Sequence, residues 1–271
     1  MIKLIALDLD GTLNNSAKII TPKTRAALLA IQDRGVLLVL ASGRPLPGLF
    51  READSLGIAG FGGSLISYNG GKVIDYANKR VIYENSIPAA TAHALLRHLG
   101  NYPVLPIVDD GQYIYTDQPQ GFQMQQESRM NQLPIRTVDN VLAAVNFDPV
   151  KVLIAAPPEI LAPHIAAISQ PFTAELSFIQ SAPFYLEATA LGVNKGAALQ
   201  MLCAELGIAR EAVMAFGDAQ NDLSMLQFAG IGVAMDNACA TLKAVADEIT
   251  LSNDDDGIAH TLGKYFPGLL P

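Results

Sequence analysis

The chain has 271 residues, of which 50% are hydrophobic and 16% charged, and its formal net charge is −8. This composition is typical of a globular protein with a substantial core and excludes a disordered chain. Lysine and arginine form no basic run, so the sequence predicts no nucleic-acid binding. The two cysteines, Cys203 and Cys239, lie among apolar and small residues, and we expect both to be buried thiols in a reducing compartment.

The N-terminal sequence MIKLIALDLDGT contains an apolar run that is too short for a signal peptide. No segment approaches the roughly 18 uninterrupted apolar residues that a membrane-spanning helix requires. We therefore expect a cytoplasmic protein that has no membrane partner. The sequence does not indicate an oligomeric state.

Residues 1–83 predict the first part of a doubly wound α/β domain. Residues 2–7 and 36–41 are apolar runs typical of buried parallel strands. The segment between them predicts a helix, with Thr21 as its cap, Pro22 in its first turn and Gly35 at its end. Strand, helix and strand in this order indicate a right-handed βαβ unit.

The C-terminal residues 187–271 return to the same alternation, with predicted helices at 195–206, 221–229 and 237–247 and predicted strands at 213–218 and 230–235. The two ends of the chain therefore predict one doubly wound, mostly parallel sheet. Residues 84–186 depart from this pattern, because strands of alternating character, such as GQYIYTD and VKVLIAA, are mixed with helices. We interpret this segment as an α+β domain inserted into the core.

Three predicted strands end in polar residues, at Asp8, Ser42 and Asp218. Ligands of open α/β sheets bind beyond the carboxyl ends of the strands, so we expect these residues to converge. The first strand end reads DLDGT. Its two carboxylates, Asp8 and Asp10, repel each other unless a cation or a proton lies between them. Thr12 and the nearby backbone N–H groups are suited to hold a phosphate oxygen.

Two further segments place groups that suit an anion. In ASGRP, Ser42 and Gly43 present a hydroxyl and a backbone N–H, while Arg44 either binds a ligand or pairs with a carboxylate. In GVNKG, Lys195 begins a helix, an unusual place for a cation unless it reaches toward anions. Taken singly, the two segments are also compatible with an ordinary turn and a solvated surface lysine.

The segment GDAQND places Asp218 at a strand end, and Asn221 and Asp222 at the start of the next helix. Together with DLDGT it brings four carboxylates into one small volume. Such a cluster requires a divalent cation, and hard oxygen ligands select Mg²⁺. The sequence therefore predicts a magnesium site that joins protein carboxylates to a substrate phosphate. The predicted metal-binding residues are Asp8, Asp10, Asp218 and Asp222.

The ordered set DLDGT, ASGRP, GVNKG and GDAQND resembles the haloacid dehalogenase superfamily of phosphotransferases over essentially the whole chain. The insert is similar to the class II type B cap of the Cof-type subfamily, and SYNGG and SAPFYLEA resemble the segments that flank that cap. The second aspartate of the first motif, which dehalogenases lack, indicates phosphate chemistry. The resemblance implies a magnesium-dependent phosphatase for phosphate monoesters of small metabolites, with sugar phosphates as the leading class.

The family pattern implies a role for each motif residue. Asp8 would be the nucleophile that forms an aspartyl-phosphate, and Asp10 would be the general acid and then the general base. Mg²⁺ would be held by the Asp8 and Asp218 side chains and the Asp10 carbonyl, with Asp222 acting through water. The residues expected to bind the phosphoryl group are Thr12, Ser42, Gly43, Arg44, Lys195 and Asn221.

Three other functions are compatible with parts of the pattern. A receiver module also carries a phosphorylated aspartate, but it is usually half this length and its aspartate ends a middle strand. A catalytically silent metabolite-binding protein on the same fold would not need the intact Asp8, Asp10, Lys195 and Asp218. A phosphomutase would keep these residues and turn over only with a bisphosphate activator.

Overall fold

The computed structural model describes residues 1–269, which form two compact units. The core unit comprises Met1–Arg44, Leu49–Tyr83 and the residues from Asn194 onward. The cap unit comprises Pro45–Gly48 and Glu84–Val193. The two ends of the chain therefore form one unit, and most of the other unit is a single continuous segment between them.

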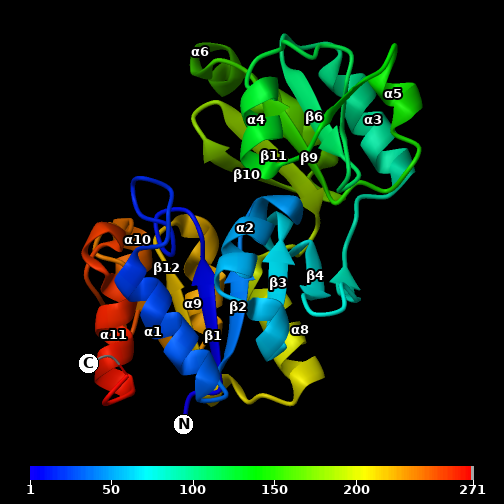
Figure 1. Cartoon of the computed structure of the whole chain (residues 1–271). Helices are drawn as coiled ribbons and strands as arrows, with labels where there is room; N and C mark the ends of the chain where they lie inside the picture. The colour runs from blue at the N-terminus through cyan, green and yellow to red at the C-terminus, as the bar shows by residue number, and fades with distance from the viewer. Residues whose placement is uncertain (270–271) are drawn as a thin grey trace. The chain divides into compact units, whose positions relative to one another are not determined.

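An eight-stranded sheet forms the centre of the core unit (Figure 1). Its strands, in spatial order, are β14 (Glu248–Ile249), β13 (Ile231–Ala234), β12 (Val213–Gly217), β1 (Leu4–Asp8), β2 (Leu37–Ala41), β3 (Ser64–Ser67), β4 (Lys72–Asp75) and β5 (Val81–Glu84). From β14 to β3 all neighbours pair in parallel, whereas β4 pairs antiparallel with β3. Because β1 lies centrally with strands added on both sides, the predicted doubly wound α/β fold is confirmed.

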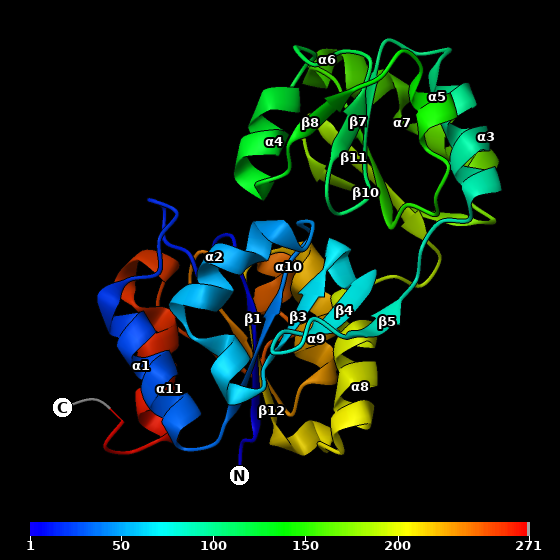
Figure 2. The same ribbon diagram turned by 45° about the vertical axis from the view of Figure 1, so that its right-hand side comes forward.

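Helices cover both faces of the core sheet (Figures 1 and 2). On one face α1 (Pro22–Asp33) packs against α11 (Gly257–Tyr265), and on the other α8 (Lys195–Leu206) packs against α9 (Leu223–Phe228). The remaining helices are α2 (Pro47–Ser55), α10 (Ala240–Lys243) and the 3₁₀ turns Ile58–Phe61, Tyr68–Gly70, Arg210–Ala212, Gln220–Asp222 and Asn253–Asp255. Among residues 1–269, no helix has both the length and the apolar character that crossing a membrane requires.

The central strands are apolar along their length because both faces of the sheet are covered. Leu4 and Ala6 of β1 belong to the buried cluster shared with α8 and α9. Their neighbours Ile5 and Leu7 alternate to the opposite face, and all four side chains are fully buried. Helix α1 begins as predicted, since the Thr21 side chain accepts a hydrogen bond from a backbone N–H of the first turn.

The cap unit is built on a mostly antiparallel six-stranded sheet, in which only the β7–β8 pair among the described pairings is parallel. The strands, in spatial order, are β10 (Leu176–Ala182), β11 (Tyr185–Ala190), β9 (Lys151–Ala155), β6 (Leu105–Asp109), β7 (Ile114–Thr116) and β8 (Ile135–Thr137). Its helices are α3 (Ala89–Leu99), α4 (Met124–Asn131), α5 (Val141–Ala144), α6 (Pro158–Leu161) and α7 (Ile165–Ser169), with 3₁₀ turns at Ala162–His164 and Gln170–Phe172. The sequence placed the end of the insert at residue 186, inside β11, whereas the pairing of β11 with β9 and β10 carries the unit to Val193.

The two cysteines differ in their environment. Cys203 is buried in the core, as predicted, but Cys239 is exposed, so the prediction of a second buried thiol is wrong. The apolar stretch around Cys239 forms only the one-turn helix α10 instead of the predicted 237–247 helix. Cys239 occupies the N-cap position of that helix and therefore lies outside its packed face.

Candidate active site

Four residues from distant parts of the sequence meet at the carboxyl edge of the core sheet. Asp8 ends β1, Lys195 begins α8, Asp218 follows β12, and Asp222 ends the 3₁₀ turn that leads into α9. The Lys195 Nζ donates hydrogen bonds to Asp8 Oδ1 at 2.5 Å and to Asp222 Oδ1 at 2.6 Å. Lys195 is fully buried. Burial alone lowers the pKa of Lys195, but the carboxylates of Asp222 and Asp8 raise it above the usual lysine value.

The three carboxylates of this group carry more negative charge than the single lysine can balance. Asp8, Asp218 and Asp222 each offer an oxygen, and these oxygens lie within 4.8 Å of one another. Burial and the Asp222 carboxylate raise the pKa of Asp8 well above its usual value, although Lys195 opposes the rise. Burial and Asp222 raise the pKa of Asp218 to about 6. A set of hard oxygen donors with surplus negative charge fits a divalent cation such as Mg²⁺.

The two oxygens of Asp222 hold the loop after β12 in place. Its Oδ1 accepts the hydrogen bond from Lys195, and its Oδ2 accepts the backbone N–H groups of Asp218 and Ala219, both at 3.0 Å. Asp222 is fully buried. It therefore fixes both the lysine and the backbone that carries Asp218.

The turn after β1 brings two residues onto Asp218. Gly11 has φ +86°, and a Cβ at this position would lie 2.3 Å from Asp218 Oδ2, so the close approach requires glycine. The Thr12 Oγ1 donates a hydrogen bond to Asp218 Oδ1 at 2.9 Å. The sequence assigned Thr12 to a phosphate oxygen, whereas in the structure its hydroxyl orients Asp218.

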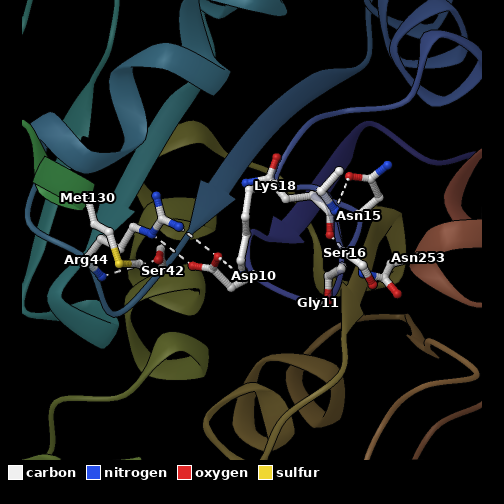
Figure 3. A network of polar contacts seen from close by, with 12 residues as sticks. Asp10, Gly11, Asn15, Ser16, Lys18, Ser42, Arg44, Met130 and Asn253 are labelled. Atoms are coloured by element: carbon white, nitrogen blue, oxygen red, sulfur yellow. Dashed lines mark hydrogen bonds and ion pairs between the residues drawn. The ribbon is translucent and has the colours of Figure 1, made fainter. Parts of the chain in front are cut away.

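Asp10 lies in a second polar network, outside the group of three carboxylates (Figure 3). The Arg44 Nε and Nη2 donate to its two oxygens at 2.8 and 2.7 Å, and the Lys18 Nζ donates at 3.0 Å. Burial raises the pKa of Asp10, but Arg44 and Lys18 together bring it below the usual value. Of the two arrangements left open for Arg44 by the sequence, the structure shows the pair with a carboxylate. Sequence reasoning missed Lys18, because an exposed lysine in a polar loop carries no distinguishing signal.

The remaining predicted residues converge on an asparagine that the sequence did not assign to the site. The backbone N–H of Asn69 donates to the Ser42 carbonyl at 2.9 Å, and the Asn69 Oδ1 accepts from Asn221 Nδ2 at 2.9 Å. Gly43 lies against the same side chain, since a Cβ there would be 3.0 Å from Asn69 Nδ2. The Ser42 Oγ accepts the backbone N–H of Arg44 at 3.2 Å. The sequence signal for Asn69 was an Asn-Gly pair, a turn signal, which is separated from the end of β3 by one residue.

Comparison with known proteins agrees with this geometry. Residues 5–262 match the model of a family described as haloacid dehalogenase-like hydrolase. The crystal structure of a haloacid dehalogenase-like hydrolase from Bacteroides thetaiotaomicron is similar to this chain, with 38% sequence identity and a TM-score of 0.94. The match covers 98% of this chain and 100% of that one.

Two curated relatives align along nearly the full length of both chains. A Streptococcus pyogenes protein named as an inferred phosphatase is 33% identical over 270 residues, covering 97% of this chain and 98% of the relative. The 5-amino-6-(5-phospho-D-ribitylamino)uracil phosphatase YitU of Bacillus subtilis is 31% identical over 273 residues, covering 97% of each. The chain therefore belongs to the haloacid dehalogenase-like hydrolases, as its motifs predicted, and it is a phosphoric monoester hydrolase of that family.

Proposed function

We propose that this protein is a magnesium-dependent phosphatase that hydrolyses small phosphorylated metabolites through an aspartyl-phosphate on Asp8. The observation that carries the proposal is the position of Asp8, which is fixed by Lys195 and gathered with Asp218 and Asp222. The cytoplasm is the proposed compartment, because both Cys203 and Cys239 are free thiols.

The carboxylate cluster supports the assignment of Mg²⁺. The Asp8 and Asp218 side chains and the Asp10 carbonyl would hold the ion. Asp222, whose two oxygens already accept hydrogen bonds, would act through Lys195 and water. When bound, Mg²⁺ supplies charge neutralisation for the transferring phosphoryl group.

The proposed reaction has two steps that use the two aspartates of DLDGT in turn. In the first, an Asp8 oxygen bonds to phosphorus, the bond from phosphorus to the leaving oxygen breaks, and Asp10 gives its proton to that oxygen. In the second, Asp10 takes a proton from water while the water oxygen bonds to phosphorus, which releases phosphate and Asp8. The ion pair with Arg44 favours the carboxylate form of Asp10, which the second step needs. The first step therefore requires Arg44 to release Asp10.

The phosphoryl group would be surrounded by donors from three loops. Lys195 and Asn221 offer side-chain N–H groups, and Ser42 and Gly43 offer a hydroxyl and a backbone N–H. Arg44 becomes available to the same anion once it leaves Asp10, and Thr12 contributes through Asp218.

Sugar phosphates and related phosphorylated polyols are the proposed substrate class. One relative is named for a substrate whose phosphate sits on a ribityl chain, which is a polyol. The groups gathered around Asp8, which are Lys195, Asp218 and Asp222, suit the phosphate itself, so selectivity for the rest of the substrate belongs to other residues.

The proposal is tested by hydrolysis of p-nitrophenyl phosphate with Mg²⁺ and with a chelator. We expect turnover that requires Mg²⁺ and falls by at least about 10³-fold in Asp8→Asn, because an amide cannot act as the nucleophile. Asp236→Asn is the matched control, since Asp236 is exposed and pairs with Lys243 outside the site. Activity that persists in the chelator, or in Asp8→Asn, would contradict the proposed mechanism.

A further inference from the structure

The short turn after β3 is held in an unusual backbone conformation. Tyr68, Asn69 and Gly70 have φ values of 51°, 57° and 106°, so three consecutive residues lie in the left-handed region. Positive φ is uncommon for residues other than glycine and is costly for a bulky aromatic residue. All three residues are buried. The surrounding contacts must therefore hold this turn in place.

Those contacts reach loops that follow strands on either side of β1. The Asn69 backbone N–H binds the Ser42 carbonyl after β2, and the Asn69 side chain accepts a hydrogen bond from Asn221 after β12. In the sheet, β2 and β12 are the two neighbours of β1, which carries Asp8. Asn69 therefore links the loops that flank the nucleophile.

The same turn also contacts the start of α8. A Cβ on Gly70 would lie 2.3 Å from the Asn194 carbonyl oxygen, so the backbones touch at this point. Asn194 is the cap of α8, and its side chain accepts the Ala197 N–H at 2.8 Å. Lys195 is the next residue along the chain. One turn thus contacts all three segments that carry the proposed phosphate-binding residues Ser42, Asn221 and Lys195.

We propose that Asn69 is a positioning residue for phosphoryl transfer. Its side chain fixes the Asn221 amide, and its backbone fixes the Ser42 loop. It thereby sets the distance between these two groups so that both can bind one phosphoryl group. This inference rests on the proposed function of Asn221 as a phosphate contact. It assigns no contact between Asn69 and the substrate.

The substitution Asn69→Gly separates the side chain from the backbone. Glycine accepts the left-handed conformation and keeps the N–H that binds Ser42, so this variant removes the Asn69 side chain alone. We expect kcat/KM for p-nitrophenyl phosphate to fall between about 10- and 100-fold, because small misplacements of a phosphate contact are costly. Lys79→Gly is the matched control, since Lys79 also has a positive φ of 60° and lies outside the site. It should keep wild-type activity.

A double-mutant cycle with Asn221→Ala distinguishes positioning from a general loss of stability. If Asn69 acts through Asn221, adding Asn69→Gly to Asn221→Ala should lower kcat/KM by less than about twofold. Equal losses in both backgrounds would overturn the inference while leaving the role of Asn221 intact. If Asn221→Ala itself leaves kcat/KM unchanged, the proposed role of Asn221 and the positioning role of Asn69 both fail. The phosphatase mechanism is tested separately by Asp8→Asn.

Asn69→Asp provides a second test, which measures the recovery of activity instead of its loss. Aspartate also tolerates the left-handed region and keeps an acceptor oxygen for Asn221 Nδ2. We expect this variant to recover most of the kcat lost in Asn69→Gly, with a raised KM because a negative charge now lies near the phosphate. A kcat as low as that of Asn69→Gly would contradict positioning through this hydrogen bond.

Discussion

The two aspartates of DLDGT lie two residues apart and occupy opposite electrostatic environments. Asp8 is buried with Asp222 and Lys195, and its pKa is raised. Asp10 is about one-third exposed, pairs with Arg44 and Lys18, and its pKa is lowered. Two titratable groups whose environments separate their pKa values are suited to different roles in one reaction. In the proposed mechanism, the buried environment belongs to the nucleophile Asp8, and the partly exposed one to Asp10, the proposed general acid and base.

The largest effect should come from removing the positive charge of Lys195 from the buried region. Lys195→Met leaves Asp8 and Asp222 buried without their shared partner. We expect the free energy of unfolding to fall by about 3–5 kcal/mol in the presence of a chelator, measured by urea denaturation. Lys243→Met removes an exposed ion pair and should cost less than about 1 kcal/mol. Similar losses in the two variants would show that the buried charges are not strongly coupled.

A second prediction concerns the close approach of Gly11 to Asp218. Gly11→Ala places a Cβ against the Asp218 carboxylate, so we expect the Mg²⁺ concentration for half-maximal activity to rise by at least about tenfold. Gly35→Ala is the control, because Gly35 has a similar φ of +83° and nothing within 4 Å of the added Cβ. It should lose only about 1–2 kcal/mol of stability and keep its Mg²⁺ dependence. An unchanged Mg²⁺ requirement in Gly11→Ala would argue against Asp218 as a metal ligand.

The pH dependence of metal binding should report the raised pKa of Asp218, which is about 6. Because this carboxyl takes up its proton more readily in the folded protein, the metal-free protein should lose stability as pH rises from about 4 to about 6. Mg²⁺ competes with that proton, so its affinity should weaken about tenfold per pH unit below about 6. Thermal unfolding with and without Mg²⁺ at pH 5 and pH 7.5 measures both effects. An equal stabilisation by Mg²⁺ at the two pH values would contradict this linkage.

The smallest effect should come from the exposed region. Lys18 is more than half exposed, and its bond to Asp10 is one of three that this carboxylate accepts. Solvent-exposed ion pairs contribute little, so Lys18→Met should change kcat/KM by less than about threefold. Arg44→Met, which removes two of the three hydrogen bonds, should lower kcat/KM more than Lys18→Met does. A larger loss in Lys18→Met than in Arg44→Met would reverse the assignment of the main partner of Asp10.

The fold followed from local patterns that need no distant partner. The apolar run that ends at Asp8 forms β1, and Thr21 caps α1 as its position before a proline indicated. Such features depend on residues within a few positions of one another, so they can be read from the chain alone. The prediction was wrong where packing decided the outcome, as at Cys239, whose apolar neighbours form a single helical turn instead of a long helix.

From the sequence alone, Asp8, Ser42 and Asp218 could be placed at strand ends and Lys195 at the start of a helix. The contacts of each side chain were settled by packing in three dimensions: Lys195 is fully buried between two carboxylates, Thr12 donates to Asp218, and Asn69 accepts from Asn221. Sequence spacing places residues on elements, but side-chain partners depend on how elements from separate parts of the sequence pack together. Burial and neighbouring charge then set the opposite pKa shifts of Asp8 and Asp10, which the motif DLDGT alone does not distinguish.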